Sequence, residues 1–490
     1  MADFLPSRRA QANLGKAPAW SLMQRVNQIP PYDPKTQPDG LINLSGALNN
    51  LMQGWWDEYF AKSPIDFDLS QILPYGSISG TDELLSTAAG FFNRFFRPSV
   101  PLEANNILAA NGITSLIDLV SWTLCDPGEA ILYPTPTFYM LDFDLGARNN
   151  VTTVPVPCSF MEDRFSEEVA PKLLSLLEKT VAAQLAKGVR CKVLFICNPA
   201  NPQGRCYSAA TLASLARFCR SHGMHLVADE VYSMSQYSSG LGSLDQFSSV
   251  LGIPEERPGS LSHVHCLYSL SKDFNMGGLR LGFLVTRNAE IRAAADTVTW
   301  FTWISSFSAL LVTQLLGDLD TISGYFSVYR KRLELEYWRT SEALTRCGIP
   351  YQASNSGLFI FIDLSQWVGY FSKDKNGSRE LNLCYYLIEH GVCLNPGEYA
   401  GSDRPGWFRF VFTEMPEANV LAIERIRKAI DLLPKMSSQR LENGRTSIDT
   451  ATTLQGESAQ LETAKMEGVA PSNWSKIRKS FPIPSCFRGE

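Results

Sequence analysis

The stretch LYSLSKDFNMGGLRLGF, from Leu267 to Phe283, is the most specific indication of fold in this chain. The apolar run HVHCLY, which begins at His263 and leads into this stretch, is typical of a buried strand. Lys272 follows the end of this strand between small hydroxyl residues, and Arg280 comes eight residues later. Ligands of open α/β sheets bind at the carboxyl ends of strands. A lysine near anion-binding side chains at such a place favours Schiff-base chemistry over a solvated surface cation.

The composition is that of an ordinary globular soluble protein with more than one domain. The chain has 490 residues, of which 45% are hydrophobic and 19% charged. This length is too great for one simple core, so we expect two or more domains. The net charge of -5 gives no general attraction to nucleic acid or to anionic membranes, and neither is expected as a partner.

Cysteine and histidine usage favours a reducing compartment and no metal site. The chain has 11 cysteines without a CxxC pair, and five histidines without the spacing of paired metal ligands. The N-terminal stretch MADFLPSRRAQANLGKAPAW lacks the apolar core of a secretory signal, and no apolar run is long enough to span a bilayer. We therefore expect a cytoplasmic protein.

The order of apolar runs predicts a large domain over residues 56–320 and a smaller α+β domain over residues 321–435. In the large domain, short apolar runs alternate with helical patterns, which predicts βαβ units and a mostly parallel sheet. The predicted strands are residues 107–110, 130–133, 192–197, 225–228 and 264–268, followed in the smaller domain by 357–364 and 407–412. Residues 1–55 are expected to form an N-terminal arm and part of the small domain. Residues 436–490 are polar, without apolar periodicity, and predict a disordered tail.

Two predicted strand ends offer contacts for a phosphate and for a flat ring. After strand 107–110, the sequence NGIT begins a helix whose first amides, at Ile113 and Thr114, suit a phosphate. After strand 130–133, YPTPTFYM places Phe138 behind a stiff Pro-Thr-Pro turn, where its ring could stack on a planar cofactor. An ordinary helix start and simple core packing are the alternatives.

Two further strand ends offer polar groups for the same ring. In CNPANPQG, after strand 192–197, Asn201 could donate a hydrogen bond to an anionic ring oxygen, although a plain turn is the alternative. In VADEVY, Asp229 ends a buried strand and needs a cationic partner, which a protonated ring nitrogen or a structural Arg or Lys would supply. Tyr232 lies three residues later and can reach the ring oxygen.

In this order, the motifs resemble those of the class I/II aminotransferase family of pyridoxal-phosphate (PLP) enzymes of fold type I, and those of 1-aminocyclopropane-1-carboxylate synthases in particular. The stretches that carry the resemblance are GLINLSGALNNL, YGSISGTDEL, NGIT, CDPGEAILYPTPTF, NPANPQG, ADEVY, SLSKDFNMGGLRLG, SNSGLF and PGWFRF. The resemblance implies an α/β fold with a mostly parallel seven-stranded sheet in the large domain. It also implies pyridoxal 5'-phosphate as cofactor and a homodimer with shared active sites.

The resemblance implies catalytic roles for Lys272, Asp229 and Tyr232. Lys272 would form the Schiff base with the cofactor, and its freed amine would move the α-proton of the substrate. Asp229 would keep the pyridine nitrogen protonated, while Tyr232 and Asn201 would bond the phenolate oxygen.

The remaining implied contacts belong to the phosphate, the ring and the substrate. The residues expected at the phosphate are Ile113, Thr114, Ser269 and Arg280, with Tyr75 supplied by the partner subunit. Phe138 would stack on the ring. Arg409, in PGWFRF, would grip the substrate α-carboxylate as a two-pronged fork, together with Asn201.

One departure from the synthases concerns the substrate. Their motif LAEN contains a glutamate that helps to handle a sulfonium substrate, and here GALNN places Leu48 at that position. Leu48 would face the substrate without offering a charge. We therefore expect an aminotransferase that acts on an amino acid or an amino-acid-derived metabolite. The alternatives are a carbon–sulfur lyase acting on a cysteine conjugate, a lyase of the aminocyclopropane-carboxylate-synthase type, and a non-catalytic binding protein on the same fold.

Overall fold

Seven strands form the larger sheet, in the order β2-β8-β7-β6-β5-β3-β4. The structure is a computed structural model that describes residues 5–14, 20–66, 68–161, 163–240, 244–373 and 377–442. The strands of this sheet are β2 (Ile107–Ala110), β3 (Ala130–Thr135), β4 (Thr152–Pro157), β5 (Cys191–Cys197), β6 (His225–Asp229), β7 (Val264–Ser269) and β8 (Gly282–Thr286). Strands β3 to β7 pair in parallel, and β8 runs antiparallel to its neighbours β7 and β2. The predicted α/β fold with a mostly parallel seven-stranded sheet is confirmed.

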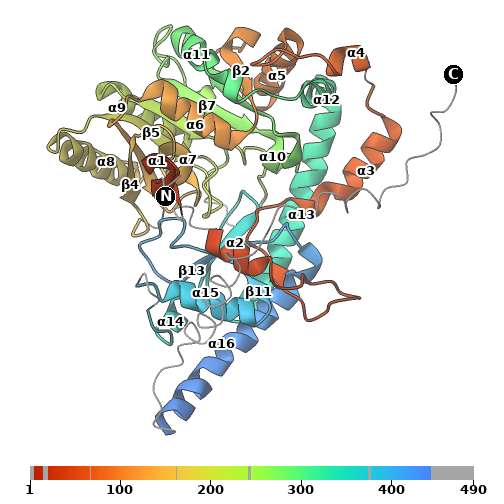
Figure 1. Ribbon diagram of the computed structural model, residues 1–490, viewed down its shortest axis with the longest axis vertical. Helices are drawn as coiled ribbons and strands as arrows, with labels where there is room; N and C mark the ends of the chain where they lie inside the picture. The colour runs from red at the N-terminus through yellow and green to blue at the C-terminus, as the bar shows by residue number, and fades with distance from the viewer. Residues whose placement is uncertain are drawn as a thin grey trace. The chain divides into compact units, whose positions relative to one another are not determined.

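Alternating side chains divide the core of this sheet into two clusters, one on each face. Strand β2 contributes Leu108 and Ala110 to the cluster that contains α6 (Ile113–Leu124), and Ile107 to the cluster that contains α5 (Asp82–Phe95). Successive residues of a strand point to opposite faces, so a strand covered on both faces is apolar throughout. In Figure 1, α6, α8 (Ala170–Leu185) and α9 (Ala209–Ser221) lie beside the strands of the larger sheet.

Side-chain caps fix several helix starts. Thr81 Oγ1 accepts a hydrogen bond from the amide of Leu84 at the start of α5, and Ser208 does the same for Thr211 at the start of α9. Such a cap stabilises a helix by about 0.5–2 kcal/mol. The other α-helices are α1 (Arg8–Asn13), α2 (Trp20–Val26), α3 (Gln53–Lys62), α4 (Leu69–Ile72), α7 (Leu141–Gly146), α10 (Leu270–Asp273), α11 (Ala289–Asp296), α12 (Ser306–Gly317), α13 (Leu319–Arg346), α14 (Ser365–Val368), α15 (Glu380–Glu389) and α16 (Asn419–Glu442).

A second, antiparallel sheet has the order β12-β13-β10-β9. Its strands are β9 (Tyr351–Gln352), β10 (Phe359–Asp363), β12 (Asn395–Pro396) and β13 (Trp407–Val411). Arg409 lies in the middle of β13, opposite Phe361 on one side and Asn395 on the other. A short parallel pair, β1 (Ile42–Asn43) and β11 (Val392–Cys393), joins the N-terminal part of the chain to this region. Both strands predicted after residue 320 are therefore present.

The described chain forms one compact unit up to Leu433, and a second unit begins at Pro434. Helix α16 continues to Glu442, so the first residues of the predicted tail are helical, whereas 443–490 lie outside the described residues. The boundaries proposed at residues 55 and 320 remain a prediction. Among the described residues, no helix is both long and apolar enough to cross a membrane.

Candidate active site

The predicted site residues gather at one edge of the larger sheet. Asp229 ends β6, and its neighbour across the strands, Cys197, ends β5 just before the loop that carries Asn201. Ser269 ends β7, and Lys272 follows in the short helix α10. Parallel strands place their carboxyl ends at the same edge of a sheet. Motifs that are far apart in the sequence are thereby brought to one place.

Gly112 and Arg280 form an anion-binding corner at the start of α6. Gly112 precedes the helix with a φ of 109°, and no side chain caps the first turn, which contains Ile113 and Thr114. This φ favours glycine, and a Cβ at Gly112 would lie 2.5 Å from Nη2 of Arg280, so the guanidinium lies directly against the glycine. Nη1 of Arg280 donates to the carbonyl oxygen of Gly277 at 2.9 Å. Open helix amides beside a guanidinium fit a phosphate group.

Ser269 is the remaining phosphate residue predicted on this chain, and it is fully buried. Its Oγ lies 2.6 Å from Oγ of Ser271 and accepts the backbone N–H of Ser271 at 3.1 Å. Ser269 also precedes α10 as its cap. Its hydroxyl therefore fixes the start of the short helix that carries Lys272.

The side chain of Lys272 is held by the N-terminal part of the chain. Its Nζ donates to the carbonyl oxygen of Ala47 at 3.0 Å. The pKa of the Lys272 amine is lowered to about 8, mainly by burial and next by the positive charge of Arg409, while Glu414 and Asp229 act in the opposite direction. A substantial part of the amine is then neutral near pH 8, and only the neutral amine attacks a carbonyl group or accepts a proton.

Asp229 is a buried carboxylate with few donors around it. Its Oδ1 accepts the backbone N–H of Val231 at 3.2 Å, and Sγ of Cys197 lies 3.8 Å from Oδ2. Burial raises the pKa of Asp229 to about 7. Among the described residues, no ion pair includes Asp229, so the structural ion pair considered from the sequence is not found. A protonated ring nitrogen would supply the missing cation.

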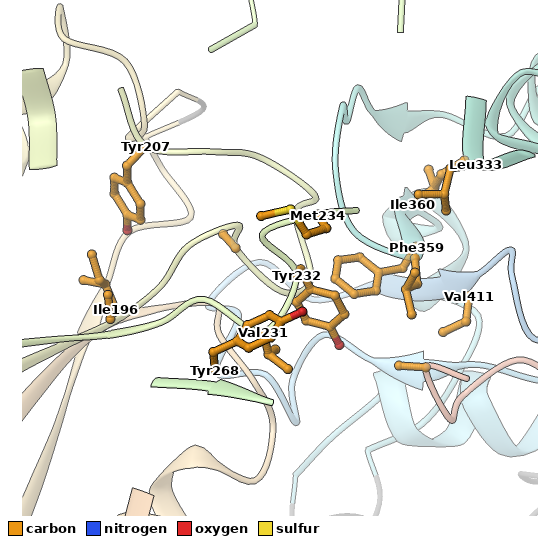
Figure 2. Close-up of a cluster of buried hydrophobic side chains, with 14 of the residues drawn as sticks. Ile196, Tyr207, Val231, Tyr232, Met234, Tyr268, Leu333, Phe359, Ile360 and Val411 are labelled. Atoms are coloured by element: carbon orange, nitrogen blue, oxygen red, sulfur yellow. The ribbon is translucent and has the colours of Figure 1, made fainter. Parts of the chain in front are cut away.

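Tyr232 lies in the buried cluster drawn in Figure 2, beside Val231 and Met234. Its ring meets the ring of Phe359 edge-on, with the centroids 5.3 Å apart and an angle of 86° between the planes. Burial raises the pKa of the Tyr232 hydroxyl, so it stays protonated at neutral pH. The hydroxyl is therefore able to donate a hydrogen bond to an anionic oxygen.

Arg409 is a buried guanidinium with a free donor. Its Nη1 donates to Oδ1 of Asn201 at 3.0 Å, and Nη2 donates to the carbonyl oxygen of Ser45 at 2.6 Å. The side chain is only 4% exposed, yet Nε has no hydrogen-bond partner. The rings of Tyr139 and Phe359 lie 5.8 and 5.5 Å from the guanidinium carbon. A desolvated donor of this kind fits the carboxylate of a substrate.

Three predicted residues lie apart from these contacts. Phe138 is partly buried after β3 and packs against the core cluster that contains α6. Tyr75 is 93% exposed, and its ring lies 5.4 Å from that of Trp303. Leu48 is 49% exposed, whereas its neighbour Asn49 is 1% exposed and donates Nδ2 to the carbonyl oxygen of Lys272 at 3.1 Å. The structure thus places Asn49, rather than the Leu48 side chain, beside the lysine helix.

A strap formed by Ser45–Asn50 joins the two active-site cations, and its contacts were not predicted. Ser45 accepts from Arg409, and Ala47, two residues later, accepts from Lys272. Ala47 adopts a left-handed backbone with a φ of 57°, which is uncommon outside glycine. The strap is fixed to Glu414, whose Oε2 accepts the N–H of Gly46 at 2.9 Å. The only sequence signal was the GALNN motif itself.

Two buried aspartates near the site were also missed. Asp273 directly follows Lys272 and accepts the backbone N–H of Met234 at 3.0 Å and the hydroxyl of Ser235. These bonds tie the lysine helix to the loop that follows β6. Asp144, in α7, lies close enough to Asp229 to interact with its charge, and its own pKa is raised to about 7, mainly by burial. The sequence signal that could have found Asp273 and Asp144 is a charged residue within a stretch predicted to be buried.

Replacing Arg409 tests its assignment as the carboxylate-binding residue. We expect Arg409→Ala to weaken the binding of every active amino acid by about 2–5 kcal/mol, because a desolvated charged contact is lost. Arg409→Lys keeps the charge without the fork and should lie in between. Substrate titrations of the purified enzyme measure both. Unchanged affinity for all substrates, with cofactor binding intact, would remove Arg409 from the substrate site.

The pKa of Lys272 gives a second test in protein without cofactor. Labelling with an amine-reactive reagent, followed by peptide mass spectrometry, should show half-maximal reactivity of Lys272 near pH 8. Arg409→Gln should move this midpoint upward, because a nearby positive charge is removed, and Glu414→Gln should move it downward. Exposed Lys172 serves as the internal control in each sample. A Lys272 midpoint equal to that of Lys172 contradicts the prediction.

Comparison with known proteins identifies the family. The model of the family "Aminotransferase class I and II" matches residues 60–426. The chain is 30% identical to 1-aminocyclopropane-1-carboxylate synthase 6 of Oryza sativa subsp. japonica, over 82% of this chain and 74% of that protein. It is 29% identical to the probable aminotransferase ACS12 of Arabidopsis thaliana, over 84% of this chain and 82% of that protein. The chain belongs to the class I and II aminotransferase family.

Solved structures share the fold. A mutant aspartate aminotransferase of Thermus thermophilus matches with a TM-score of 0.67 and 19% identity, over 87% of this chain and 99% of that chain. The kynurenine aminotransferase of Pyrococcus horikoshii matches with a TM-score of 0.65 and 17% identity, over 87% of this chain and 97% of that chain. These neighbours agree with the fold-type I architecture that the resemblance implied.

The described residues fit pyridoxal 5'-phosphate, the cofactor of this family. Arg280 beside the uncapped start of α6 suits its phosphate, and the unpaired carboxylate of Asp229 suits its pyridine nitrogen. Lys272, with its lowered pKa, suits its carbonyl group. The protein is therefore a PLP-dependent enzyme.

Proposed function

We propose that this enzyme transfers the amino group of an amino acid, or of an amino-acid-derived metabolite, to a 2-oxo acid. The observation that carries the proposal is the convergence of Lys272, Asp229 and Arg409. The charges of Asp229 and Arg409 both act on the Lys272 amine, and the strap Ser45–Asn50 bonds Arg409 and Lys272. Amino-group transfer requires a lysine whose neutral amine reacts with a carbonyl group, a partner for a ring nitrogen and an anchor for a carboxylate.

Each side chain has a defined task in this proposal. Bound PLP would supply the electron sink that stabilises negative charge at the substrate α-carbon. Arg409 anchors the α-carboxylate and so orients the α-hydrogen toward Lys272. The neutral amine of Lys272 takes this proton and returns it to a different atom. Asp229 would keep the ring nitrogen of bound PLP protonated, and Tyr232 would donate a hydrogen bond to its ring oxygen.

A carbon–sulfur lyase is the second candidate function. Both reactions need the same proton removal at the α-carbon, and they differ only in whether a leaving group departs from the β-carbon. One relative is named as a 1-aminocyclopropane-1-carboxylate synthase, which favours keeping a lyase under consideration. The resemblance aligns Leu48 with the glutamate of LAEN, and a leucine offers no charge to a sulfonium group, so we expect S-adenosylmethionine to be a poor substrate.

We further propose a cytoplasmic homodimer. Tyr75, which the resemblance assigns to the active site of the partner subunit, is 93% exposed. Trp300 and Phe301 are 61% and 74% exposed, and Trp303 packs against Tyr75. Exposed aromatic side chains gathered in one place are typical of an interaction surface. A cytoplasmic location agrees with the free cysteines of the described chain.

The decisive experiment follows the cofactor spectrum and pyruvate together. The enzyme is incubated with aromatic amino acids and with S-substituted cysteines, without any 2-oxo acid. A transferase should stop after one turnover, with the cofactor in its amine form, and should restart on addition of 2-oxoglutarate or pyruvate. Continued release of pyruvate from a cysteine conjugate, with an unchanged spectrum, would establish the lyase instead. Lys272→Ala is the inactive control.

A further inference from the structure

A large cavity lies away from the active-site lysine. Its volume is about 1050 Å³, and its walls are the end of α5, the start of α9, the loop 246–254 and one face of α13. This volume is slightly above the range of about 300–1,000 Å³ that is usual for small-molecule sites. None of the residues named in the active site lines this cavity.

The titratable residues of this cavity are all cations. Arg94 lies in the last turn of α5, and Arg97 follows that helix. Arg330 and Lys331 come from α13, and no aspartate or glutamate is in the lining. None of the four cations forms an ion pair with an acidic residue of the described chain. Positive charges grouped in this way repel one another, and an anion bound between them would relieve the repulsion.

Helix α13 presents polar groups to this cavity where a packed helix would present apolar ones. The residues that face the cavity lie three, four, seven and eight positions along the helix from the first, which is one helical stripe. They are Ser323, Phe326, Ser327, Arg330 and Lys331. Phe326 of this stripe packs in the core, and the hydroxyl of Ser323 donates to the carbonyl oxygen of Leu319 within the helix. The remaining three residues of the stripe supply one hydroxyl group and two cations as donors to a ligand.

Arg330 is fixed in position as a binding residue should be. Its Nε donates to the carbonyl oxygen of Met234 at 3.3 Å, and Nη2 lies 3.7 Å from Sδ of Met234. Burial lowers the pKa of Arg330, Asp273 opposes this change, and the positive charge of Arg97 adds to it. Nη1 has no partner in the described chain. Arg330 and Arg97 both line the cavity, so the charges of both act on an anion bound in it.

The apolar walls indicate what kind of anion fits. Phe326 is buried and meets the ring of Phe95 edge-on at 5.2 Å, and Phe247 meets Phe96 at 6.1 Å. Phe95 and Phe247 remain partly exposed at the cavity. Aromatic side chains bind planar or apolar groups, whereas the guanidinium groups bind phosphate or carboxylate oxygens. An inorganic ion would contact only the guanidinium groups and not the aromatic side chains.

We propose that this cavity is a binding site for a small organic polyanion, which carries two or more phosphate or carboxylate groups on a partly planar body. Arg97, Arg330 and Lys331 bind its charged groups, and Phe95 and Phe247 contact its body. The site is separate from the phosphate corner at Arg280, so it is available while PLP is bound.

Calorimetric titration of the PLP-loaded enzyme tests this proposal with ATP, pyrophosphate and citrate as probes. At least one probe should bind, with a dissociation constant below about 1 mM at low salt. The affinity should fall about tenfold or more at about 0.5 M salt, because exposed charges are screened. If ATP binds more tightly than pyrophosphate, the ligand has a planar body in addition to its phosphate groups. If citrate binds more tightly than pyrophosphate, the charged groups of the ligand are carboxylates.

Two substitutions and a matched control locate the binding. Arg97→Gly suits the left-handed backbone at this position, where φ is 50°, and Lys331→Gln lies on an exposed helix surface, so both proteins should fold. Each should weaken binding about five- to tenfold, whereas Lys172→Gln, on exposed α8, should leave it unchanged. Absence of binding by all probes up to about 10 mM would overturn the proposal. Equal weakening by Lys172→Gln, or loss of binding only in an Arg280 variant, would overturn it as well.

Discussion

Lys272→Ala should reduce turnover by about four orders of magnitude or more, because one side chain provides both the covalent link and the proton transfer. The wild-type enzyme should be yellow, and borohydride should fix the cofactor to Lys272. In the Lys272→Ala variant, borohydride treatment should leave no cofactor covalently bound to the protein. Absorbance spectra and peptide mass spectrometry measure both effects.

Folding must be checked before this loss is attributed to chemistry. Nζ of Lys272 makes one hydrogen bond, to Ala47, so thermal unfolding of the variant without cofactor should change by no more than about 1–2 kcal/mol. Lys192→Ala, at a lysine outside the site, is the matched control and should keep full activity. A reducible imine at another single lysine in the Lys272→Ala protein would show that Lys272 is wrongly assigned.

The larger sheet was predictable where strands are buried on both faces. Such strands are short and mostly apolar, as in β5 and β7, and their length favours a strand over a buried helix. Strand β4 was missed because TTVPVP contains two prolines, which argue against a strand. It is tolerated because β4 lies at the edge of the sheet. Strand β8 was not predicted: its apolar run GFLVT is short and directly follows GGLRL, whose glycines are typical of a turn.

The site was predictable where a side chain belongs to a motif on a strand end, as Lys272 and Asp229 do. The strap was not, because it acts through backbone carbonyl groups, and a carbonyl group has no residue-specific signal. The bond between Gly46 and Glu414 joins positions 368 residues apart. The position of Asn201 beside Arg409 depends on how the two sheets meet, so it was expected from the resemblance to a family and not from any local pattern.

The buried carboxylate of Asp229 has opposite consequences with and without the cofactor. Its pKa is raised from 3.8 to about 7 by burial. Between these pH values, the folded protein without cofactor binds more protons than the unfolded chain, so its stability falls as the pH rises. Asp229→Asn removes this titration. Relative to the wild type, the cofactor-free variant should therefore gain stability between about pH 4 and pH 7, which thermal unfolding measures.

With the cofactor bound, the same substitution should be strongly damaging. Asp229→Asn should lower turnover about 10²–10³-fold or more, because an asparagine does not hold a proton on the ring nitrogen and the positive charge that attracts electrons is lost. A PLP analogue methylated at the ring nitrogen carries this charge permanently, so it should restore part of the activity in Asp229→Asn but not in Lys272→Ala. Asp144→Asn is the matched control, since it removes a nearby buried carboxylate and should cost far less. Full activity of Asp229→Asn with ordinary PLP would separate Asp229 from the ring nitrogen. A loss that the methylated analogue leaves unchanged would assign Asp229 to the packing of the site.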